Sequence, residues 1–155
     1  MKLKFVIVLA MALSMASCGG DKPKNEVPKA APEKAVEAET ANADPMANKG
    51  IGPISSVSLG EIDQAMVVQG ETVFKAKCSA CHKISKKFVG PALKGVTARR
   101  SPEWIMNMII NPEEMIKEDP IAIKLLAEAN GAPMANQNIT EEEARALLEY
   151  FRTKN

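Results

Sequence analysis

The chain has 155 residues, of which 46% are hydrophobic and only 4% are aromatic. This length suits one domain, and so few aromatic residues favour a core that a bound cofactor helps to fill. The formal net charge is +1 and no basic segment is interleaved with aromatic residues, so nucleic-acid binding is not expected.

The first 17 residues have the composition of an export signal. Lys2 and Lys4 precede an apolar run over positions 5–15. As a helix this run would rise about 16 Å, which is too short for the hydrocarbon core of a membrane, about 30 Å thick. We therefore expect residues 1–17 to be a signal peptide rather than a transmembrane helix.

Ala16 and Ser17 precede Cys18, and this short segment resembles the cleavage site of bacterial lipoproteins. The resemblance implies that Cys18 becomes the lipidated first residue of the mature protein and anchors it to a membrane. Met15 departs from the leucine that this site usually has three residues before the cysteine. The alternative is simple secretion.

Residues 18–58 form a segment rich in Lys, Glu, Ala, Pro and Asn, with few large apolar side chains. Its prolines are Pro23, Pro28, Pro32, Pro45 and Pro53. Such a composition cannot bury enough surface to offset the entropy lost on ordering, so we expect a disordered tether after the lipidated cysteine. The folded domain is then expected over residues 59–155.

The apolar pattern of this domain predicts an all-α fold, with a first helix that runs towards Cys78. Ser101-Pro102 and Asp119-Pro120 each pair an N-cap with a first-turn proline, so each should open a helix. The remaining boundary signals are Asn111-Pro112 and Asn130-Gly131 at helix ends, and a capping box of Thr140 with Glu143 before the last helix.

Cys78, Cys81 and His82 form a C-x-x-C-H sequence, the pattern that attaches a c-type haem. The two thiols bond to the two vinyl groups of one haem, and the adjacent histidine binds the iron. A redox-active dithiol is less favoured, because that motif belongs to a βαβ setting. A zinc site is also disfavoured, since it needs four ligands and His82 is the only histidine of the chain.

With this motif the sequence resembles the class I cytochrome c family, over residues from about 61 to 155. The resemblance implies four to five helices around one covalently bound haem. Gly70 and Phe74 match the family's packing pair on the first helix, and Leu147 and Tyr150 match their partners on the last. All four also fit an ordinary helical core.

Gly90-Pro91-Ala92-Leu93 is similar to the G-P-x-L loop of the family, in which the Pro91 carbonyl accepts a hydrogen bond from His82. The family also places a methionine ligand in a loop before its last helix, which implies Met134 as the second ligand of the iron. Met115 is the alternative, although its helical setting suits a core residue.

Trp104, Arg99 and Arg100 stand where small cytochromes often bind the haem propionates, which need cationic or N–H donors. The alternative is that Trp104 belongs to the core and that both arginines are solvated.

An iron with both axial positions filled suits single-electron transfer better than catalysis, so we expect an electron carrier and not an enzyme. We expect a monomer on the periplasmic side of a bacterial membrane. Its donor would be a quinol-oxidising complex, and its acceptor an oxidase or a periplasmic reductase. The alternative function is a haem-based sensor or gas-binding module with a labile sixth ligand.

Residues 75–100 contain eight basic residues and no acidic one. Because this basic block includes the attachment motif, we expect a positive surface there that attracts acidic sites on redox partners. The alternative is an ordinary solvated surface.

Overall fold

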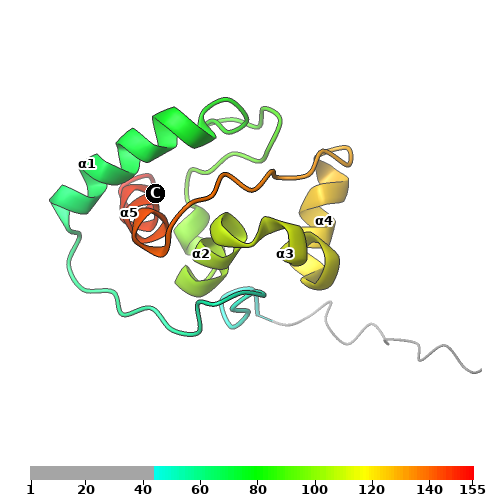
Figure 1. Ribbon diagram of the computed structural model, residues 1–155, viewed down its shortest axis with the longest axis horizontal. Coiled ribbons are helices and arrows are strands. Elements are labelled where there is room, and N and C mark those ends of the chain that lie inside the picture. Colours follow the sequence, from blue (N-terminus) through cyan, green and yellow to red (C-terminus); the bar gives the residue numbers. More distant parts are fainter. Residues whose placement is uncertain (1–43) are drawn as a thin grey trace, which may run out of the picture. The chain divides into compact units, whose positions relative to one another are not determined.

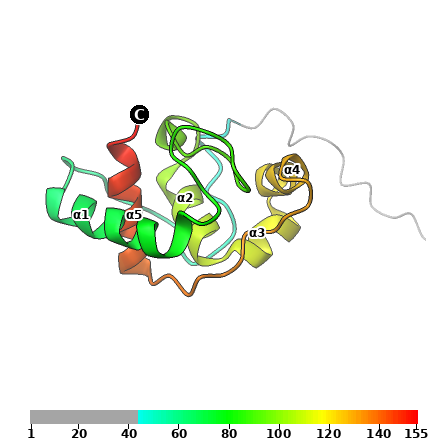
Figure 2. The same ribbon diagram turned by 90° about the horizontal axis from the view of Figure 1, so that it is seen from above.

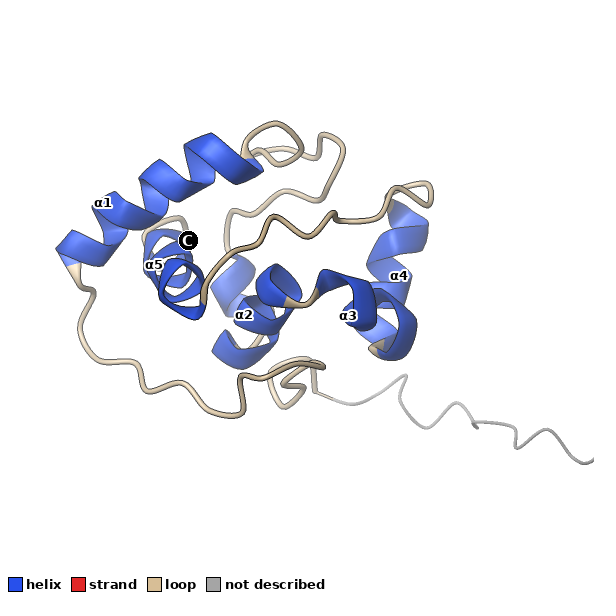
Figure 3. Cartoon of the chain, viewed as in Figure 1, coloured by secondary structure: helices blue, strands red, loops and turns tan. Residues whose placement is uncertain are grey.

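The computed structural model describes residues 44–155, which belong to one compact unit. The expected signal peptide, Cys18 and the first part of the expected tether lie outside the described residues. The regular elements in order are α1 (Gln64–Val73), a π-helical turn (Phe74–Cys78), a 3₁₀ turn (Val96–Ala98), α2 (Pro102–Ile110), α3 (Pro112–Glu118), α4 (Pro120–Glu128) and α5 (Glu141–Arg152). Residues 44–155 contain no strand, which confirms the predicted all-α class (Figure 1, Figure 3).

The helices begin at the caps that the sequence predicts. The Ser101 hydroxyl accepts the Trp104 N–H at 3.1 Å, and the Asp119 carboxylate accepts the Ala122 N–H at 2.8 Å. Both halves of the Thr140 capping box are present. The helix α3 was not predicted, because Pro112 was interpreted only as a stop signal. None of the helices in the described range has the length and apolar character needed to cross a membrane.

α1 and α5 cross at a contact that only glycine permits (Figure 2). A Cβ atom on Gly70 would lie 2.1 Å from the carbonyl oxygen of Ala146 and 2.9 Å from the Cβ of Tyr150. Beside this crossing the rings of Phe74 and Tyr150 pack with centroids 5.5 Å apart, and Leu147 is fully buried. The packing expected from the family resemblance is therefore present, and it determines where the end of α1 lies.

Residues 48–57, which we call the strap, are folded onto α2 and α3, although we expected them in the tether. Ile54 is only 5% exposed. The side chain of Asn107, which is 1% exposed, accepts the Ile54 N–H at 3.0 Å and donates to the carbonyls of Lys49 and Ile54, both at 2.9 Å. The Ile51 N–H points at the sulfur of Met115 at 2.9 Å. The ordered part of the chain thus begins before the expected boundary at residue 59, because side chains of α2 and α3, above all Asn107, satisfy backbone groups of the strap.

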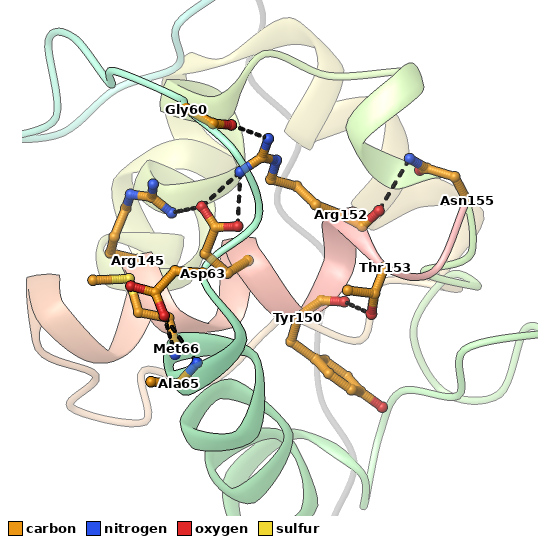
Figure 4. Close-up of polar contacts among 10 residues, drawn as sticks. Gly60, Asp63, Ala65, Met66, Arg145, Tyr150, Arg152, Thr153 and Asn155 are labelled. Carbon is orange, nitrogen blue, oxygen red and sulfur yellow. Dashed lines mark hydrogen bonds and ion pairs between the residues drawn. The ribbon is translucent and has the colours of Figure 1, made fainter.

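Figure 4 shows polar contacts within α5, at the start of α1, and between α5 and the segment before α1. The buried carboxylate of Glu149 pairs with both Arg145 and Arg152, and Arg152 also donates to the carbonyl of Gly60 at 2.7 Å. Asp63 caps α1 from the surface. Its carboxylate accepts the backbone N–H of Ala65 at 2.8 Å and that of Met66 at 3.1 Å. The bond from Arg152 to Gly60 thus holds the segment before α1 against α5.

Candidate functional site

The end of α1 presents both cysteines and the histidine on one turn. The helix widens into a π-helical turn that ends at Cys78, a geometry often found at functional sites. The carbonyl of Cys78 then accepts the N–H of Cys81 at 3.1 Å and that of His82 at 2.9 Å. Both thiols are free; Cys78 is half-buried and Cys81 is exposed. The motif therefore offers two unpaired thiols beside one imidazole.

The imidazole of His82 is oriented by the segment that follows. Its Nδ1 lies 3.2 Å from the carbonyl oxygen of Pro91, so the hydrogen bond expected from the family resemblance is present. Gly90 lies against the flat of the ring, because a Cβ there would be 2.3 Å from Cε1 and 2.7 Å from Nδ1. The N–H of Gly90 also donates to the carbonyl of Cys81 at 3.0 Å. Since Nδ1 is engaged, Nε2 is the ring nitrogen left for a metal.

Burial gives these ligand groups their protonation states. It lowers the pKa of His82, and the hydrogen bond to Pro91 opposes this only in part, so the imidazole is neutral at pH 7, as iron binding requires. Burial raises the pKa of the Cys78 thiol, while the neighbouring Lys77 acts in the opposite direction. The thiol is thus held in its neutral form.

The two candidate methionines lie in different settings. Met134 is half-buried in the irregular segment 131–140 between α4 and α5. Met115 is fully buried on α3, where its sulfur faces the strap. Seen from above, the segment 131–140 runs along one edge of the domain, below the loop that follows α1 (Figure 2). The assignment of Met134 as the second ligand of the iron, with Met115 as the alternative, stays a prediction.

The residues expected near the propionates are already engaged within the protein. Trp104 is 4% exposed, and its indole N–H donates to the buried carboxylate of Asp119 at 3.0 Å. This contact disfavours a propionate bond from Trp104. Arg99 donates to the carbonyls of Lys94 and Ala92, and Arg100 lies over the Trp104 ring, 5.4 Å from its centroid. For both arginines, propionate binding stays a prediction.

Sequence reasoning missed the role of Asp119, which it treated only as the start of a helix. A hydrophilic residue in a cap position gives no sign of burial, and Asp119 is 1% exposed. Its indole partner lies 15 residues away, so periodicity alone could not reveal the contact.

The donor set fits haem and does not fit a metal held by protein alone. Within residues 44–155, no group of three or more histidine, cysteine, aspartate or glutamate side chains could hold a metal ion. Two thiols and one oriented imidazole on a single turn instead match the covalent attachment of a haem with one axial histidine. The residues that would hold it are Cys78, Cys81 and His82.

Comparison with known proteins agrees with this geometry. The family model for cytochrome c matches residues 67–154. Cytochrome c-551 of Stutzerimonas stutzeri is 35% identical over 91 residues, which cover 56% of this chain and 77% of that protein. Cytochrome c-551 of Azotobacter vinelandii is 33% identical over 89 residues, covering 54% and 95% respectively. A solved structure, a cytochrome c from Rhodothermus marinus, is 47% identical with a TM-score of 0.67, covering 71% of this chain and 96% of that chain.

A helical domain with two thiols and an oriented histidine on one turn defines a c-type haem protein. Because the family match spans more than half of the sequence, the chain belongs to the cytochrome c family. Members of this family bind covalently attached haem c, and the single C-x-x-C-H motif gives this chain one such group.

Replacing Gly90 with alanine tests the orientation of the imidazole. The added methyl group would meet the ring, so we expect His82 to rotate and the g-values of the low-spin ferric EPR spectrum to shift. Overpacking should also cost about 1–3 kcal/mol in the free energy of unfolding, measured with urea. Gly60→Ala is the matched control, because a Cβ at Gly60 meets nothing within 4 Å. An unchanged EPR spectrum in Gly90→Ala would contradict the assigned role of Gly90.

Proposed function

We propose that this protein carries single electrons outside the cytoplasm, with His82 and Met134 as the axial ligands of its haem. The observation that supports this most directly is the bond from His82 to the Pro91 carbonyl, beside a glycine that leaves room for the ring. A histidine fixed in one tautomer is a stronger and less mobile ligand. A rigidly held ligand suits an iron that changes only its oxidation state during electron transfer.

The residues of the chain bind and orient the cofactor. Cys78 and Cys81 would hold it through thioether bonds, and Pro91, bonded to His82, would orient the imidazole for the iron. When bound, the haem supplies a one-electron couple at its iron. If His82 and Met134 both bound the iron, no coordination site would remain for a substrate, so the proposed role is transfer to a partner and not catalysis at the iron.

Replacing Met134 with alanine tests the sixth ligand. Ferric protein with a methionine–iron bond has a weak near-infrared charge-transfer band, and we expect Met134→Ala to lose it while haem attachment persists. Met115→Leu should keep the band, because Met115 is a core residue that contacts the strap. A parent protein that lacks the band and binds carbon monoxide readily would instead favour the haem-based sensor or gas-binding module. Loss of the band only in Met115→Leu would make Met115 the ligand.

The proposed partners are redox proteins with acidic docking sites: a quinol-oxidising complex as donor, and an oxidase or periplasmic reductase as acceptor. The basic block of residues 75–100 surrounds the attachment motif. Within it Lys86 and Lys94 are exposed, and so are two adjacent apolar side chains, Phe88 at 54% and Val89 at 45%. The ammonium group of Lys83 lies 5.2 Å from the Phe88 ring centroid. An apolar tip among lysines suits a partner surface with an apolar centre and a carboxylate rim.

Charge removal on this surface tests the docking of acidic partners. The probe is a strongly acidic flavodoxin in its hydroquinone form, which gives one electron to the ferric protein and becomes a semiquinone. In stopped-flow measurements at low ionic strength, we expect Lys86→Gln with Lys94→Gln to slow this reaction about threefold to tenfold and to weaken its salt dependence. The control is Lys117→Gln with Lys124→Gln, which removes the same charge from exposed positions on α3 and α4. Equal slowing in both double variants would contradict a local docking surface.

We further propose that Cys18 anchors the protein to a bacterial membrane on its periplasmic side. In cells that produce the full chain, the parent should sediment with membranes, and Cys18→Ser should appear in the soluble periplasmic fraction. Lipid attachment should also raise the mass of the parent above that of the cleaved chain, as mass spectrometry can measure. A Cys18→Ser variant that stays with the membranes would contradict the anchor and leave the electron-carrier proposal intact.

A further inference from the structure

The described domain contains two fully buried carboxylates in opposite electrostatic settings. Glu149 is 0% exposed and pairs with two arginines. Asp119 is 1% exposed and bonds only to neutral donors. These donors are the indole N–H of Trp104 at 3.0 Å, the backbone N–H of Ala122 at 2.8 Å and the Asn48 side-chain amide at 2.7 Å. None of the ion pairs in the described domain includes Asp119.

Three hydrogen bonds hold the Asp119 carboxylate in place. They do not cancel the charge, since each donor is neutral. The cation in its neighbourhood is Arg100, whose guanidinium lies over the Trp104 ring. Burial and the adjacent Arg99 lower the pKa of Arg100, while Asp119 and Glu128 act in the opposite direction. The interior of α2–α4 therefore carries a negative charge without a bonded counter-ion.

A buried charge of this kind acts over the whole of a small domain. A chain of about 100 residues has a radius of gyration of about 13 Å, so a core carboxylate lies within roughly this distance of a centrally bound cofactor. Interior charges are screened by salt much less than surface charges. At about 13 Å and an effective dielectric constant of about 20, one unit charge changes a redox equilibrium about tenfold.

We propose that Asp119 sets the reduction potential of the haem. Its negative charge stabilises the ferric form, which carries one more positive charge than the ferrous form, and so lowers the potential. The strap takes part, because Asn48 holds one oxygen of this carboxylate. The inference rests on the proposed electron carrier and adds a residue outside the haem-attachment motif that determines which partners can reduce it.

The test is the midpoint potential of the intact haem-loaded protein, measured by spectroelectrochemistry, in which each ferric iron takes one electron from the electrode. Asp119→Asn removes the charge and keeps a side chain suited to a helix N-cap. At a fixed electrode potential we expect the ratio of ferrous to ferric protein to rise about threefold to tenfold; tenfold corresponds to about 59 mV for one electron. The shift should persist at high salt.

Asp63→Asn is the matched control, since Asp63 also caps a helix but is exposed. We expect a smaller shift that salt abolishes. Asn48→Lys is a second variant, which brings a cation to the same carboxylate from the strap and should raise the potential without altering Asp119. It keeps the proposal testable if Asp119→Asn does not fold.

An unchanged or lowered potential in folded Asp119→Asn would overturn the role of Asp119, as would an equal, salt-resistant rise in Asp63→Asn. If Asp119→Asn does not fold, an unchanged potential in Asn48→Lys would do the same. A parent protein without a reversible one-electron couple would instead overturn the proposed electron carrier itself. The two failures are therefore distinguishable.

Discussion

The close crossing of α1 and α5 is the contact on which the site depends. Backbone meets backbone at Gly70 and Ala146, a distance that any side chain at Gly70 would prevent. Because α1 continues without interruption into the turn that ends at Cys78, the crossing also places the first thiol of the attachment motif. The aromatic rings beside it then close this side of the core. Haem attachment thus takes place on an element whose position is already fixed by helix packing.

Local sequence signals predicted most of the fold because they act over a few residues. The caps at Ser101, Asp119 and Thr140 open helices through contacts with backbone three residues further on, and such contacts can be recognised in the sequence itself. The attachment motif is equally local, so its three residues could be identified without a structure. The bond from His82 to Pro91 spans nine residues and was expected only through the family resemblance.

Contacts between distant segments were not predictable in this way. The strap has the glycine, proline and serine content of a linker, and its order depends on distant side chains such as that of Asn107, 53 residues after Ile54. The burial of Asp119 likewise depends on Trp104 and Asn48, which approach from two separate segments. Trp104 was expected as a propionate donor, with a core position as the alternative, and its hydrogen bond to Asp119 could not be inferred from periodicity.

The strap also decides how the domain bears mechanical load. A pull on the chain from its N-terminal side meets hydrogen bonds to the helix caps first at Asn48, whose carbonyl accepts the Ser101 hydroxyl and whose amide donates to Asp119. Further along, the Asn107 side chain clamps the backbone of Ile54. The force therefore passes into α2 and the start of α4 before it can reach α1. A pull on the chain at residue 44 would thus load α2 and α4 before the helix that carries the cysteines.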